Sequence, residues 1–185
     1  MTTITQIPGY VVGTWDIDAS HSTVGFSVRH MMVSKVRGYF RDFSGEIVTA
    51  EDPARSTVTA TIDLSSIDTR QEQRDAHIRS ADFFDVDNHP QMTFRSTEVR
   101  ADGADWVVDG ELTIKGNTRP VTLALELNGF GPDAYGGVRA GFSARTEINR
   151  NEFGVDIKMP MDGGGVVVGD KISVELEIEA VLRTA

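Results

Sequence analysis

A strict alternation of apolar and polar residues limits what this 185-residue chain can fold into more than any other feature. Residues 57–64, 122–127 and 173–180 each place an apolar side chain at every second position. This period of two is typical of β-strands with one face against the core and the other in water. Less regular runs of the same kind cover residues 14–18, 23–30, 36–49, 91–100, 105–114 and 138–148. Because Gly, Asn and Asp clusters separate these runs, the sequence predicts an all-β fold, an antiparallel sandwich or barrel of about eight strands.

One segment departs from this alternation and predicts a short helix. Residues 68–79 carry straight-chain and charged side chains where the strands carry β-branched ones. Thr69 and Glu72, three residues apart, predict a capping box at the start of the helix. The apolar residues of the segment are Ala76 and Ile78, so the helix is expected to lie on the surface. No internal repeat and no linker divides the chain, which predicts a single domain over residues 1–185.

Composition excludes several classes of function. With 28 acidic residues against 18 basic ones, the formal net charge is −10, which argues against nucleic-acid binding. Cysteine is absent, so disulfides, thiol catalysis and cysteine-ligated metals are excluded. The four histidines have none of the spacings of a zinc site, and we expect neither a metal nor a cofactor. No nucleophile with a neighbouring base is apparent, so no catalytic residue is assigned.

The amino-terminal residues carry no recognisable export signal. They lack the basic and apolar regions of a signal peptide. No apolar run in the chain reaches the length of a transmembrane helix. The sequence therefore predicts a cytoplasmic protein.

His30 is the histidine whose position invites a functional interpretation. It ends the alternating series Val24, Phe26 and Val28, so it shares the face assigned to the interior. A polar ring on an apolar interior face needs a partner, and that partner is either another core group or a bound ligand. Both interpretations stay open, and the second includes an enzyme in which His30 is the acid or base for a barrel-bound lipid or small molecule.

The inward positions of the predicted strands form a large apolar set. An eight-stranded barrel has an interior just wide enough to be filled by side chains or to hold one small ligand. The pattern alone favours the filled interior. Met31 and Met32, next to His30 and followed by Lys35, are expected at the rim, where flexible thioethers suit an adaptable opening.

Four motifs resemble the YceI-like family. The first is HSTVGFSVRH at 21–30 with SKVRGYF at 34–40 and FSG at 43–45. The second is IRSADFFDV at 78–86, closing on HPQMTF at 89–94. The third is GELTIKG at 110–116 with Pro120 and Val121, and the fourth is INR at 148–150 leading into FGV at 153–155 and VGD at 168–170. These motifs occur in the family's order and extend over residues 15–182.

The resemblance implies an extended lipocalin-like antiparallel β-barrel with a short helical excursion. It also implies a tunnel that binds a polyisoprenoid or similar long-chain amphiphilic lipid, such as an isoprenoid quinone, without catalysis. This implication reverses the preference for a filled interior, and it makes His30 and Lys35 candidates to touch a head group. Family members are commonly exported to the periplasm, and the sequence departs from them in having no signal. The residues expected to contact the ligand are Phe26, Val28, His30, Met31, Met32, Lys35, Phe40, Phe94, Trp106, Leu112, Ile114, Leu123, Leu125, Phe142 and Leu176.

The same reasoning assigns partners and supporting residues. The expected partner is the lipid, with transient membrane contact for lipid exchange and no nucleic acid. A homodimer through an outer strand is compatible with the pattern. Arg150, beside Asn149 at a strand end, is expected to hold the structure by hydrogen bonds rather than to touch the ligand.

Overall fold

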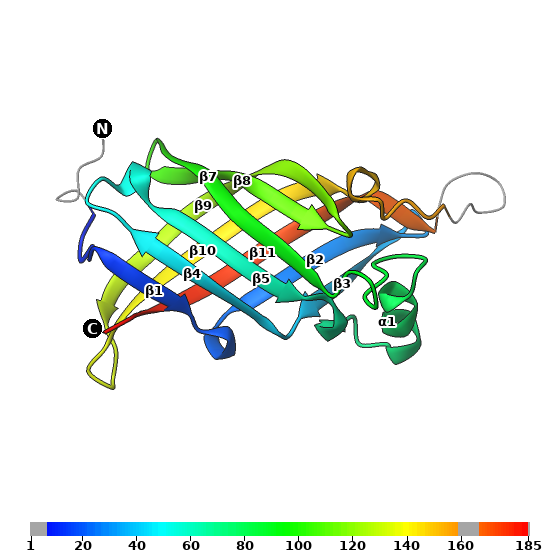
Figure 1. The fold of residues 1–185 in the computed structure, drawn as a ribbon, viewed down its shortest axis with the longest axis horizontal. Helices are drawn as coiled ribbons and strands as arrows, with labels where there is room; N and C mark the ends of the chain where they lie inside the picture. Colours follow the sequence, from blue (N-terminus) through cyan, green and yellow to red (C-terminus); the bar gives the residue numbers. More distant parts are fainter. Residues whose placement is uncertain (1–6, 159–166, 185) are drawn as a thin grey trace.

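The strands of the computed structural model follow the alternation of the sequence closely (Figure 1). The structure describes residues 7–158 and 167–184. The first six strands are β1 (Gly13–Ile17), β2 (Thr23–His30), β3 (Ser34–Phe40), β4 (Phe43–Thr49), β5 (Thr57–Asp63) and β6 (Ile67–Asp68). The helix α1 (Glu72–Arg79) follows, and then β7 (Gln91–Asp102), β8 (Asp105–Ile114), β9 (Asn117–Pro132), β10 (Val138–Asn149) and β11 (Val168–Leu182).

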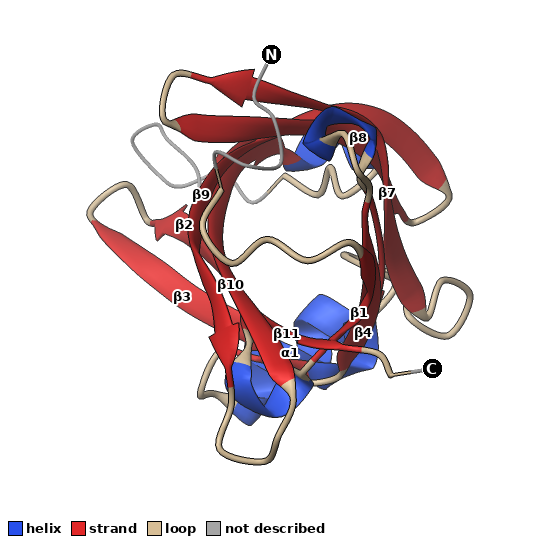
Figure 2. Ribbon diagram, turned by 90° about the vertical axis from the view of Figure 1, so that its left-hand side faces the viewer, coloured by secondary structure: helices blue, strands red, loops and turns tan. Residues whose placement is uncertain are grey.

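Eight of these strands close into an antiparallel barrel, which Figure 2 shows end-on. The ring runs β1-β4-β5-β7-β8-β9-β10-β11, and pairing between β11 and β1 completes it. The barrel is long because β9 and β11 have 16 and 15 residues. At about 3.3 Å per residue, 15 residues cover roughly 50 Å along the strand. The predicted fold class, an extended lipocalin-like barrel of about eight strands with one short helix, is confirmed.

A three-stranded extension grows from one end of the ring. The carboxyl-terminal part of β11 pairs with β1, whereas its amino-terminal part pairs with β2, and β3 and β6 follow β2 at the edge. The prediction of one strand over residues 36–49 is wrong, because the chain breaks at Arg41 and Asp42. β3 pairs with β2 and β4 pairs with β1, so the two halves of that run join different parts of the sheet.

The helix α1 packs beside this extension, and its cap differs from the predicted one. Gln71 is the capping residue, and its side-chain oxygen accepts from the backbone N–H of Arg74. Thr69 is instead buried, and its hydroxyl donates to the buried carboxylate of Asp75 while accepting from Nε of Arg74 at 2.8 Å. The capping box is therefore wrong, because Thr69 ties the first turn of the helix to β6. None of the described helices is long and apolar enough to cross a membrane.

Candidate functional site: the barrel cavity

The barrel interior is hollow. It contains a cavity of about 710 Å³, within the range of roughly 300–1,000 Å³ that small-molecule sites occupy. Inward side chains such as Phe26, Leu125 and Leu176 stay only partly buried, because they face this cavity rather than a neighbouring side chain. The filled interior that the sequence pattern alone favoured is therefore wrong.

The wall of the cavity is a continuous apolar surface because the strand register aligns inward residues. One layer of inward residues crosses five neighbouring strands, β2, β11, β10, β9 and β8. Each member lies directly opposite the next in the strand register, in the order Val24, Leu176, Ala144, Leu125 and Trp106. All five residues line the cavity. Period-two alternation keeps every member of such a layer on the same face of the sheet. The wall can therefore receive a long apolar molecule without burying polar groups against it.

Two glycines let phenylalanine rings lie flat against the wall. Gly38 on β3 faces Phe26 on β2, and Gly110 on β8 lies under the ring of Phe94 on β7. A Cβ atom on either glycine would overlap the phenyl ring that covers it. An aromatic ring over a neighbouring-strand glycine is a recognised way to stabilise a curved sheet. Here it also keeps two large side chains out of the middle of the cavity.

An aromatic cluster lies at the end of the cavity where β1 begins. The Phe130 ring lies 5.3 Å from Tyr10, 5.5 Å from Trp15 and 6.2 Å from Phe142, measured between ring centroids. Trp15 Nε1 donates to the Thr49 hydroxyl at 2.9 Å. The Tyr10 hydroxyl donates to a backbone carbonyl at 2.7 Å, and burial raises the pKa of this phenol. These hydrogen bonds fix the rings, so an aromatic layer whose polar atoms are satisfied lies at this end of the cavity.

The opposite end of the cavity has a polar lining. Arg29 and His30 contribute from β2, and Gln71, Gln73 and His77 contribute from the helical excursion. All except His30 are exposed, so the cavity wall reaches solvent at this end. The cavity is thus lined by aromatic rings at one end and by polar, exposed side chains at the other, an arrangement that suits an amphiphile.

Most of the predicted ligand-contacting residues line the cavity. Met31, Met32 and Lys35 do not: all three are exposed in the β2–β3 hairpin. Lys35 lies directly opposite Arg29 in the strand register but does not line the cavity, and the two methionines form the turn. Ligand contact stays a prediction for these three residues and equally for the residues that line the cavity. The cavity wall includes Phe26, Val28, His30, Phe40, Phe94, Trp106, Leu112, Ile114, Leu123, Leu125, Phe142 and Leu176.

Sequence reasoning missed the contribution of the helical excursion to the wall. Gln71, Arg74 and Ile78, spaced three and four residues apart, all line the cavity, as do Phe83 and Phe84 after the helix. That spacing places the three side chains on one face of the helix, and it could have indicated that this face meets the cavity. The prediction of a surface helix overlooked it because the face carries a single apolar residue. Tyr10 and Phe130 were missed for another reason: neither the amino-terminal segment nor the end of β9 shows the alternation.

Arg150 holds the loops at the polar end together. Its buried guanidinium donates from Nε to the Gly169 carbonyl at 2.9 Å and from Nη1 to the Val155 and Ile157 carbonyls at 2.8 and 2.9 Å. A longer contact of 3.3 Å reaches the Asp170 carboxylate. The expected structural hydrogen bonds are present, since one side chain satisfies carbonyl groups from both sides of the loop before β11. Arg150 also lines the cavity, so the absence of ligand contact stays a prediction.

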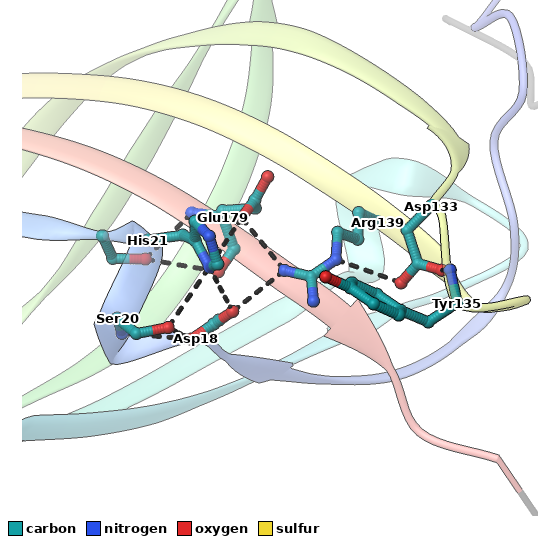
Figure 3. A network of polar contacts seen from close by, with 8 residues as sticks. Asp18, Ser20, His21, Asp133, Tyr135, Arg139 and Glu179 are labelled. Atoms are coloured by element: carbon teal, nitrogen blue, oxygen red, sulfur yellow. Dashed lines mark hydrogen bonds and ion pairs between the residues drawn. The ribbon is translucent and has the colours of Figure 1, made fainter.

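A polar network lies at the seam that closes the barrel, outside the cavity (Figure 3). Asp18, His21 and Glu179 offer ligand atoms within 4.8 Å of one another, as a metal site would. The same carboxylates already bind Arg139, whose Nη1 lies 2.9 Å from Asp18 Oδ2 and 3.0 Å from Glu179 Oε2. A metal ion would have to displace this guanidinium, so we assign the network a structural role in joining β10, β11 and the turn after β1.

The network predicts a loss of stability in acid. Hydrogen bonds from the Ser20 hydroxyl, Arg139 and His21 hold the pKa of Asp18 well below its usual range. A carboxyl whose pKa is lower in the folded state stabilises the fold above its unfolded pKa, about 3.9, and loses that contribution as the pH falls further. In urea titrations, Asp18→Asn should lower the unfolding midpoint at neutral pH and flatten its fall below about pH 4. Asp87→Asn, at an exposed loop carboxyl, is the control, and equal behaviour of the two variants would contradict this role.

Known proteins resemble this chain in sequence and in fold. The model of the YceI-like domain matches residues 15–180. A UPF0312 protein of Photorhabdus laumondii is 42% identical over 139 residues, 75% of this chain and 72% of that protein. Protein YceI of Escherichia coli is 43% identical over 141 residues, 76% of this chain and 74% of that protein.

Solved structures share the barrel. Burkholderia cenocepacia BcnA has a TM-score of 0.75 at 25% identity, covering 88% of this chain and 98% of its own. The Campylobacter jejuni YCEI protein has a TM-score of 0.70 at 28% identity, with coverages of 84% and 90%. A polyisoprenoid binding domain from Saccharophagus degradans has a TM-score of 0.69 at 15% identity, with coverages of 94% and 100%.

Proposed function

Because this chain belongs to the YceI-like family, we propose that it carries or sequesters a polyisoprenoid or similar long-chain amphiphilic lipid, such as an isoprenoid quinone, without catalysis. The observation that carries the proposal is the apolar cavity of about 710 Å³ inside a long barrel. The cavity extends to the cluster of Tyr10, Trp15, Phe130 and Phe142, here called the aromatic plug. The Saccharophagus degradans neighbour of the same fold is described as polyisoprenoid-binding, which supports this class of ligand.

The expected affinity is high and comes from burial rather than from directed bonds. A chain of about 40 heavy atoms at about −0.3 kcal/mol per atom would gain about −12 kcal/mol, which corresponds to a nanomolar dissociation constant. An apolar wall recognises the length and width of a tail more than its chemical detail. Tails of similar length should therefore compete with one another.

The two unlike ends of the cavity suggest an orientation for the lipid. The tail would point toward Phe130 and the plug, because the Tyr10 hydroxyl and the Trp15 indole N–H there are already hydrogen-bonded within the protein. The head would lie among His30, Gln71 and His77, where the wall is polar and exposed. Loading and release would then take place at this end, during transient contact with a membrane.

Narrowing the cavity tests the proposal. Val28→Trp should reduce uptake of added solanesol, a long isoprenoid alcohol, at least about tenfold, because the indole fills space that the tail needs. Native mass spectrometry and lipid extraction would measure uptake. Thr23→Trp, on the outer face of the same strand, is the matched control and should bind like the parent. A parent protein that holds no amphiphile after purification and takes up no solanesol would refute the proposal.

A second candidate function rests on the position of His30 on the cavity wall. An imidazole there could transfer a proton to or from a bound lipid or small molecule. Comparing the parent with His30→Ala separates the two functions. Turnover that disappears in the variant identifies an enzyme, whereas binding without turnover in both proteins supports the carrier.

A further inference from the structure

The turn between β2 and β3 exposes three consecutive apolar side chains. Met31, Met32 and Val33, here called the hairpin tip, have 43%, 52% and 85% of their surface in solvent. Such clustered exposure is unusual on a soluble surface and is typical of a site that meets another apolar phase.

The backbone conformation of the hairpin tip is energetically unfavourable for methionine. Met31 and Met32 have φ angles of 51° and 64°, and the Val33 N–H donates to the His30 carbonyl at 3.2 Å. A turn with two central residues at positive φ strongly favours Asn-Gly. Methionine is sterically disfavoured in that conformation because its Cβ atom comes too close to the following carbonyl oxygen. Because the methionine side chains point into solvent, the fold itself does not explain them.

The strands behind the hairpin tip form a positive surface in a negative protein. Between Asp18 and Asp42 the sequence has no acidic residue, although the whole chain has a net charge of −10. Arg29 and Lys35 are exposed and directly opposite each other in the sheet, and Arg37 follows two residues later. Like charges in such cross-strand pairs repel.

Neighbouring carboxylates do not relieve this repulsion. Within residues 7–158 and 167–184, no carboxylate oxygen lies within 4 Å of the charged nitrogens of Arg29, Lys35 or Arg37. At the adjacent ends of β10 and β11, Glu147 lies beside Lys171 and Asp170 beside Arg150. An external anionic surface would supply the missing negative charge.

The hairpin tip also lies next to the polar end of the cavity. His30, immediately before it, lines the cavity, and Val168, opposite His30 in the register, lines it too. In Figure 1 the hairpin of β2 and β3 extends toward the same end of the barrel as α1. A surface bound by the hairpin tip would therefore lie against the end at which a lipid head would emerge.

We propose that the hairpin tip inserts into the surface of a bilayer rich in anionic phospholipid, with Arg29, Lys35 and Arg37 held over the phosphate groups. The inference rests on the proposed carriage of a lipid and names the membrane partner of that site. Apolar side chains at the interface and basic residues above it are the two requirements of reversible membrane binding.

Flotation with vesicles of phosphatidylcholine and phosphatidylglycerol in equal parts tests the proposal. The parent should float with these vesicles, less at high salt, and much less with phosphatidylcholine alone. Val33→Ser/Arg37→Gln should lower partitioning at least about tenfold, since each basic residue near an anionic surface accounts for about fivefold. Met31→Asn/Met32→Gly should lower it as well, in a turn that is intrinsically more favourable.

Matched controls separate this surface from the rest of the protein. Tyr135→Ser removes a side chain that is 89% exposed in another turn, and Arg95→Gln removes a cation from another strand. Both should float like the parent. A parent that does not bind the anionic vesicles, or controls that lose as much binding as the hairpin variants, would overturn the proposal.

Solanesol loading distinguishes a failure of this inference from a failure of the proposed function. Val33 and Arg37 lie outside the cavity wall, so their double variant should take up solanesol added in ethanol as the parent does. Normal loading of a parent that ignores vesicles refutes the membrane site alone. Vesicle binding by a parent that cannot be loaded refutes the carrier function and leaves the membrane site standing.

Discussion

Leu125→Asp should abolish uptake of a long isoprenoid. Leu125 lies on the cavity wall between Trp106 on β8 and Ala144 on β10, and both neighbours are apolar. A carboxylate placed there would have to lose its water when the tail enters. At about 4 kcal/mol or more for an uncompensated polar group, the dissociation constant should rise at least about a thousandfold. Titration with solanesol, read by native mass spectrometry, measures the loss.

The adjacent residue provides the control for this variant. Ala124 is exposed on the outer face of the same strand, so Ala124→Asp adds the same charge one position away. Circular dichroism establishes whether Leu125→Asp is folded, and Val28→Trp tests the cavity without adding a charge. A folded Leu125→Asp protein that still bound solanesol tightly would show that the tail does not occupy the barrel.

Arg150→Met should cause the largest loss of stability. The substitution keeps much of the side-chain volume but leaves the Val155, Ile157 and Gly169 carbonyls without their donor. An unsatisfied buried group costs about 1–3 kcal/mol, and the part-buried Ile157 and Gly169 carbonyls cost less than the buried Val155 carbonyl, so the free energy of unfolding should fall by about 4 kcal/mol in total. For a chain of this length, the melting temperature should fall by about 12 °C. Urea titration and thermal melts measure both quantities.

An exposed arginine provides the comparison for Arg150. Arg95 forms its ion pair with Glu111 at the surface, at 2.9 Å, and Arg95→Met should change the unfolding free energy by about 0.5 kcal/mol or less. Arg150→Lys should fall between the two, because one ammonium group cannot reach carbonyls on both sides of the loop. Similar losses for Arg95→Met and Arg150→Met would contradict the structural role of the buried guanidinium.

The sequence predicted the wall of the barrel well because the alternation that marks the inward residues of a strand also sets its pairing register with the neighbouring strands. Once Val24, Phe26 and Val28 are assigned to one face, the pairing of β2 with its neighbours places them on the cavity wall. The alternating pattern did not show whether the interior of the barrel is hollow or filled. The free volume depends on how Gly38 and Gly110 seat the neighbouring rings, which is a property of pairs of strands.

The ends of the barrel were harder to predict than its wall. Tyr10 and Phe130 meet although they lie 120 residues apart and belong to no alternating run. Thr69 resembled a helix cap in sequence, but tertiary contact with Asp75 gave it another role. Loops and ends take their structure from such distant contacts, which a local pattern does not contain.

The aromatic plug would give a lipid-carrying barrel a fixed point from which the length of the tail is measured. In the proposed carrier, a tail that entered from the polar end would advance until it met Phe130, whose ring contacts Tyr10 and Trp15. Every additional isoprene unit would gain contact until the tail reached that ring, and any further unit would remain outside. A protein that carried a lipid in this way would act as a gauge, and the distance between the plug and the rim would set the longest tail that it could shield completely.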